Sequence, residues 1–187
     1  MSNNTAFAIG VGITTTSHDI DTLDVLEISM ASYNSDFMLL NQTTLVIGHD
    51  LADLNFNGIT AKTYIDSDLL NNVNDSRCTI AAAHTHMRDW LERQYTNAPH
   101  SPYLLNNDGM FVRAVLQRFM PETLEFLNTA TIDTTAIEIL ANTHNVPIRL
   151  PKRIPNAFNQ AKHCATIISQ GYITPLLLAY GQHNTGS

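Results

Sequence analysis

Apolar side chains in the first quarter of the chain fall into three runs that are separated by short polar segments. Residues 7–13 are apolar apart from two glycines, which is typical of a strand buried at the centre of a sheet. Residues 23–33 and 37–47 predict two more strands, and residues 34–36, Asn-Ser-Asp, have the composition of a hairpin turn between them. We therefore predict an antiparallel meander of three strands at the start of the chain.

Helical spacing dominates the middle of the chain. Residues 48–75 are rich in Asn and Asp and predict short helical turns and loops. Over residues 79–95 the apolar side chains recur every three or four positions, so they share one stripe of a helix. The stripe consists of Ile80, Ala83, Met87, Trp90 and Leu91. This spacing predicts an amphipathic helix that packs on a core.

The remainder alternates short strands with helices. Asp108 precedes helical spacing that runs to Phe119, which makes it a predicted N-cap, and Pro121 follows the end of that helix. The other predicted elements are strands at 103–105 and 130–133, helices at 134–142 and about 157–170, and a closing segment at 172–180. This order predicts an α/β ribonuclease-H-like fold, with a mixed central sheet flanked by helices. We expect one domain over residues 1–187.

Residues 107–122 carry the most specific motif of the chain, Asn-Asp-Gly-Met-Phe-Val-Arg-Ala-Val-Leu-Gln-Arg-Phe-Met-Pro-Glu. The segment resembles the second motif of the DnaQ-like, or DEDD, superfamily of 3′→5′ exonucleases, and within it oligoribonuclease and exonuclease A of T-even phages. In that motif a helix begins with a metal-binding Asp and often ends in Met-Pro-Glu. Counting back from Met120 and its Pro-Glu places this Asp at Val112.

Two further segments resemble later parts of the same superfamily. Residues 131–134, Thr-Ile-Asp-Thr, resemble the Asp-Thr step that opens its next helix, and residues 159–165 resemble its last motif, His-x-Ala-x-x-Asp-Ala. In that register Asn159 stands at the general base and Cys164 at the final metal ligand. A shift by one residue places Phe158 and His163 there instead.

The first strand also departs from the superfamily. Gly10 and Gly12 stand where the resemblance expects an Asp-x-Glu pair, although residues 27–29, Glu-Ile-Ser, resemble the Glu-Ile-Ala of its second strand. Exonucleases of this kind hold two divalent ions ~3.5–4 Å apart on carboxylate oxygens. Gly10, Gly12, Val112 and either Cys164 or His163 provide no such set. The resemblance therefore implies a pseudo-exonuclease with no catalytic residues, bound metal or other cofactor.

Other arrangements stay open on sequence grounds. The cleft near Asp108, Asp133 and His163 is a candidate binding region, and the same residues with a loop acid are candidates for a relocated metal site. Asp108 and Asp133 are each more typical of a helix start than of catalysis. The pair Gly10-x-Gly12 does not complete a dinucleotide-binding motif, because Thr15 replaces the third glycine.

The negative net charge of the chain favours a protein over nucleic acid as the expected partner. The chain has a formal net charge of −7 with ten Lys and Arg, so it has no general basic surface for a phosphate backbone. We expect weak or no binding to nucleic acid, and a protein partner such as a host nuclease, polymerase or defence component. The alternative is a nucleic-acid or nucleotide binder that does not cleave. The resemblance to exonuclease A implies a phage-encoded protein.

Cysteine content and hydropathy bear on location. Cys78 and Cys164 are far apart and form no CxxC motif, which predicts two buried reduced thiols. No signal peptide is evident and no apolar run approaches the ~20 residues of a membrane span. We expect a cytoplasmic protein, in the host cytoplasm if it is phage-encoded, with no membrane partner. The oligomeric state is left open, a homodimer included.

Overall fold

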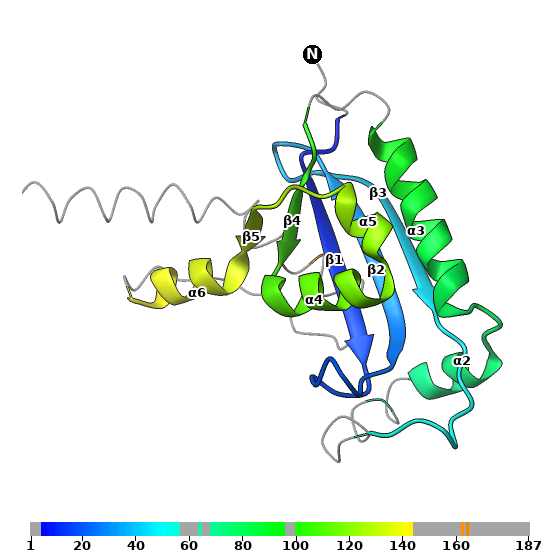
Figure 1. Cartoon of the computed structure of the whole chain (residues 1–187). Helices are drawn as coiled ribbons and strands as arrows, with labels where there is room; N and C mark the ends of the chain where they lie inside the picture. The colour runs from blue at the N-terminus through cyan, green and yellow to red at the C-terminus, as the bar shows by residue number, and fades with distance from the viewer. Residues whose placement is uncertain are drawn as a thin grey trace, which may run out of the picture.

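The computed structural model describes residues 5–56, 64, 68–95, 100–143, 162 and 164. Its centre is a sheet of five strands in the order β3-β2-β1-β4-β5 (Figure 1). The strands are β1 (Ala8–Thr15), β2 (Val25–Tyr33), β3 (Leu39–Val46), β4 (Tyr103–Asn106) and β5 (Thr131–Asp133). β2 runs antiparallel to both β1 and β3, whereas β4 runs parallel to β1, and β5 runs parallel to β4. The predicted meander and mixed sheet are confirmed.

Five described helices accompany the sheet (Figure 1). They are α2 (Leu69–Asp75), α3 (Ile80–Tyr95), α4 (Gly109–Phe119), α5 (Pro121–Glu125) and α6 (Thr134–Thr143). The predicted apolar stripe of α3 is confirmed, since Ala83, Met87, Trp90 and Leu91 are buried and Ile80 is partly buried. Among the described residues, no helix is long and apolar enough to cross a membrane.

Alternation along β1 divides the core into two layers. Successive side chains of a strand point to opposite faces of the sheet. Ile9, Val11 and Ile13 belong to the large core cluster that also contains residues of α3 and α4, while Ala8 belongs to a separate cluster. We call these the helix face and the second face of the sheet.

The structure adds one helix that the sequence did not predict and leaves two predicted segments untested. The helix after Asp108 ends at Phe119, as predicted, but a further helix, α5, begins at Pro121. Proline is favoured at the first helical position, where its missing N–H breaks no intrahelical hydrogen bond. The predicted helix at 157–170 lies outside the described residues except for Lys162 and Cys164, which are helical, and the segment at 172–180 lies wholly outside them.

Candidate functional site

Gly10 and Gly12 lie on the second face of the sheet. Gly10 pairs with Ala31 of β2 and with Leu105 of β4, and Gly12 pairs with Ser29. Directly paired residues point to the same face, and Ala31 and Leu105 are both buried in the cluster on the second face. The two positions of the expected Asp-x-Glu pair therefore carry no side chain and have small or apolar neighbours.

Cys164 packs on this same face. Its side chain is fully buried and contacts the cluster that contains Ala31 and Leu105, the two residues that flank Gly10. The hydroxyl of Thr134, the first residue of α6, donates a hydrogen bond to the Cys164 sulfur at 3.3 Å. The resemblance makes Cys164 the final metal ligand, which would lie beside the ligand positions Gly10 and Gly12. The structure places Cys164 on the same face as these two glycines. The prediction of a buried free thiol is confirmed for Cys164 but wrong for Cys78, which is only partly buried.

Val112 lies in a different environment. It is buried in the first turns of α4, within the large cluster on the helix face that includes Ile9 and Val11. Val112 and Cys164 therefore belong to separate clusters. The remaining motif positions, Asn159 with the alternative pair Phe158 and His163, lie outside the described residues.

The turn between β4 and α4 is held by two side chains. Asp108 accepts a hydrogen bond from the Phe111 backbone N–H at 3.2 Å, so the predicted N-cap is confirmed. Asn106 is buried, and its amide nitrogen donates to the Val11 carbonyl while its amide oxygen accepts from the Asp108 N–H. Sequence analysis missed Asn106, although a strand that ends in Asn or Ser is itself part of the superfamily motif.

Asp133 plays a similar part at the next strand end. Its carboxylate accepts the Thr135 N–H at 2.8 Å at the start of α6, and its backbone pairs with Asn106 across β4 and β5. Asp108 and Asp133 therefore both lie at the carboxyl ends of neighbouring strands, and both carboxylates accept backbone N–H groups. Among the described residues, no group of three or more His, Cys, Asp or Glu is placed to hold a metal ion.

Two polar side chains on the second face were not singled out as site residues by the sequence. Glu27 is buried on β2 and accepts a hydrogen bond of 3.5 Å from the Thr14 hydroxyl of β1. The Tyr33 hydroxyl is buried and has no hydrogen-bond partner among the described residues. Burial, followed by the nearby Cys164, raises the pKa of Tyr33 well above its ordinary value. The face thus combines apolar side chains with a few enclosed polar groups.

Solved structures that are similar to this chain include nucleases. The nuclease domain of 3′hExo, a DEDDh family member bound to rAMP, has a TM-score of 0.59 and 11% identity, over 87% of this chain and 90% of that one. Product-bound exonuclease I has a TM-score of 0.63 and 10% identity, over 94% of this chain and 46% of that one. S. pombe Pop2p with Mg²⁺ and Mn²⁺ bound has a TM-score of 0.56 and 10% identity, over 88% and 82%.

These similarities establish a fold rather than an activity. No protein-family model matches the sequence, and no curated protein matches it. The strand order, the mixed sheet and the flanking helices are those of the ribonuclease-H-like, DnaQ-type exonuclease fold. The fold predicted from the motif resemblance is therefore confirmed.

Proposed function

We propose that this chain is a catalytically inactive exonuclease-like protein, encoded by a phage, that acts by binding a protein partner. A host nuclease, a host polymerase or a defence component is the class of partner that we favour. Folds host many functions, so the proposal rests on the side chains at the site. The observation that carries it is the set of residues at the four expected metal-ligand positions.

The residues at those positions do not fit a pair of hard divalent ions. Mg²⁺ and Mn²⁺ take oxygen ligands, chiefly carboxylates and water. Gly10 and Gly12 offer no side chain, Val112 is buried among apolar side chains, and Cys164 is a buried thiol beside the Thr134 hydroxyl. A site of this composition supplies neither the negative charge nor the oxygen atoms that the two-metal reaction requires.

Surface charge favours a protein over nucleic acid as the partner. The net charge of −7 repels phosphates at long range. Arg88 forms ion pairs of 2.9 Å with Asp89 and Glu122, and Arg118 pairs with Asp21 at 3.1 Å, so both guanidinium groups already have carboxylate partners. Trp90 is buried in the core and offers no exposed ring on which a base could stack.

A phage origin is supported by residues 107–122, whose sequence resembles the corresponding motif of exonuclease A of T-even phages. An acidic protein on a nuclease scaffold is also suited to imitate nucleic acid towards a basic partner surface.

Affinity capture from a nuclease-treated bacterial lysate tests the proposal. We expect a specific bacterial protein to be retained by the folded bait and not by heat-unfolded bait. The purified pair should then re-form without nucleic acid. Binding to single-stranded oligonucleotides with a Kd below about 1 μM at physiological salt, with no protein retained, would contradict the proposal.

A further inference from the structure

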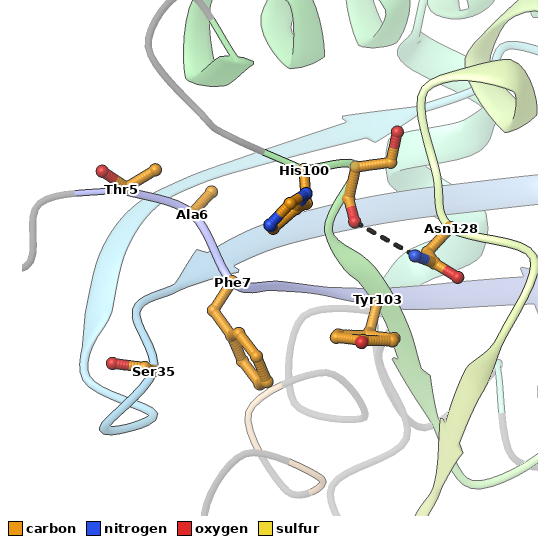
Figure 2. Close-up of a pocket in the computed structure, with 8 residues that line it drawn as sticks. Thr5, Ala6, Phe7, Ser35, His100, Tyr103 and Asn128 are labelled. Carbon is orange, nitrogen blue, oxygen red and sulfur yellow. Dashed lines mark hydrogen bonds between the residues drawn. The ribbon is translucent and has the colours of Figure 1, made fainter.

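A pocket lies at the amino ends of the parallel strands β1 and β4, away from the Asn106 end of β4 (Figure 2). Its volume is about 520 Å³, within the range of about 300–1,000 Å³ that is typical of small-molecule sites. The lining residues that matter here are Thr5, Phe7, His100, Ser101, Tyr103 and Asn128. We propose that this pocket binds a neutral planar heteroaromatic molecule of nucleoside type.

Two aromatic rings form one side of the pocket. The ring centroids of Phe7 and Tyr103 lie 5.2 Å apart with their planes inclined by 58° (Figure 2). Phe37 meets Phe7 edge-on at 5.8 Å. Backbone hydrogen bonds fix the ring-bearing segments, from the Tyr103 N–H to the Phe7 carbonyl at 3.0 Å and from the Phe7 N–H to the Tyr33 carbonyl at 2.8 Å. Rings held in this way offer a preformed surface for a flat ligand.

A positioned amide forms another side. The Asn128 backbone N–H donates to the Pro102 carbonyl at 2.8 Å, and its side-chain oxygen accepts the Ala130 N–H at 2.9 Å. Its side-chain nitrogen donates to the Ser101 carbonyl at 3.5 Å (Figure 2). A primary amide has two N–H donors, and only one is engaged among the described residues. The second is available to an acceptor atom on the edge of a ring, and His100 adds an imidazole nearby.

The charge of the lining selects the ligand class. None of the described lining residues is Asp, Glu, Lys or Arg, so a phosphate or carboxylate would find no opposite charge in the pocket. Aromatic faces with amide, imidazole and hydroxyl groups fit the flat face and polar edge of a nucleobase. The same base within a nucleic acid brings phosphates, which the acidic chain repels. A nucleoside therefore fits better than a nucleotide or an oligonucleotide.

An NMR titration of the full chain with adenosine and uridine tests this proposal. At least one nucleoside should shift the backbone amide signals of Phe7, Tyr103 and Asn128 with a Kd below about 1 mM, leaving those of Asn106 and Asp108 in place. Adenosine monophosphate and a four-residue oligoadenylate should bind more weakly than adenosine. Tighter binding of either phosphate-bearing ligand, shifts confined to the Asp108 end, or no shift with either nucleoside would overturn the proposal.

Matched variants locate the contact. Tyr103→Leu and Phe7→Leu should each weaken nucleoside binding by at least about tenfold. Phe111→Leu removes a half-buried ring that packs on His18 instead, and should leave binding unchanged. A folded Tyr103→Leu or Phe7→Leu protein that binds nucleoside as tightly as the wild type would contradict the assignment. If a variant fails to fold, the signal shifts of the wild-type protein still test where the nucleoside binds. The outcome is independent of the proposed partner, because the pocket shares no residue with the four ligand positions.

Discussion

Two tyrosine hydroxyls, those of Tyr33 and Tyr64, differ in their hydrogen bonding. The Tyr33 hydroxyl is buried without a partner among the described residues, whereas the Tyr64 hydroxyl donates to the Thr15 carbonyl at 3.1 Å. Burial raises the pKa of both phenols, with Cys164 a second cause at Tyr33 and Glu27 a second cause at Tyr64. An enclosed polar group without a partner is costly, so the difference should be measurable.

We expect Tyr33→Phe to leave the free energy of unfolding unchanged or to raise it at pH 7, because it deletes an unpaired hydroxyl. Tyr64→Phe is the matched control and should lose about 1 kcal/mol with its hydrogen bond. Urea denaturation at fixed temperature measures both. An equal loss in the two variants would mean that Tyr33 has a hydrogen-bond partner.

The same substitution has a defined pH dependence. The folded chain keeps the Tyr33 proton above pH 10, the pKa range of an unfolded tyrosine, while the unfolded chain releases it. Stability should therefore be full below about pH 10 and fall as the pH rises further. Tyr33→Phe should make this alkaline fall shallower. An unchanged slope would show that Tyr33 ionises equally easily in both states.

Among the elements, the β4–α4 turn depends most on one side chain. Asn106 joins the Val11 carbonyl of β1 to the Asp108 N–H, and Asp108 in turn caps α4. Asn107 is half-buried, and the hydrogen bond it accepts from the Thr135 hydroxyl goes to its backbone carbonyl. The Asn106 side chain therefore makes the hydrogen bonds that hold the turn, whereas Asn107 contributes through its backbone carbonyl.

Asn106→Ala should lower the free energy of unfolding by about 2 kcal/mol or more, because it leaves a buried carbonyl and a backbone N–H unpaired. Asn107→Ala keeps the backbone carbonyl and should change stability by no more than about 0.5 kcal/mol. Thermal or urea unfolding of the two variants gives the comparison. A smaller loss in Asn106→Ala than in Asn107→Ala would contradict this reading of the turn.

Strand and helix periodicity predicted most of the described elements. The three runs at the start of the chain became β1 to β3, and the stripe with Met87 and Trp90 is the buried side of α3. Pro121 was taken only as a helix stop, since sequence alone does not separate that role from the first position of a new helix.

Fewer features of the candidate site could be predicted from the sequence. Counting along the motifs placed Val112 and Cys164 at expected ligand positions. It did not predict that the two residues lie in separate clusters, because burial depends on contacts between distant segments. Asn106 was overlooked for a similar reason. In the sequence, a polar residue at the end of a short strand cannot be told from a loop residue. Only the hydrogen bond to Val11 of β1 shows that Asn106 is buried and structural.

The whole molecule has an exonuclease-like fold, but the residues at its four motif positions are not carboxylate ligands. The sheet order and the flanking helices are those of nucleases such as 3′hExo. This chain has 17 acidic residues, yet none of them stands at the four motif positions. Two such acids, Asp108 and Asp133, accept backbone N–H groups at helix starts. We therefore predict that this chain has a nuclease fold but does not cleave nucleic acid.

The most direct test is incubation of 5′-labelled single-stranded DNA and short RNA with the folded protein in Mg²⁺ or Mn²⁺, beside an active exonuclease. Asp108→Asn keeps an N-cap while removing the carboxylate, so with His163→Ala it identifies any relocated site. We predict that both substrates stay at full length in either metal. Metal-dependent shortening from the 3′ end, lost in Asp108→Asn or His163→Ala, would contradict it.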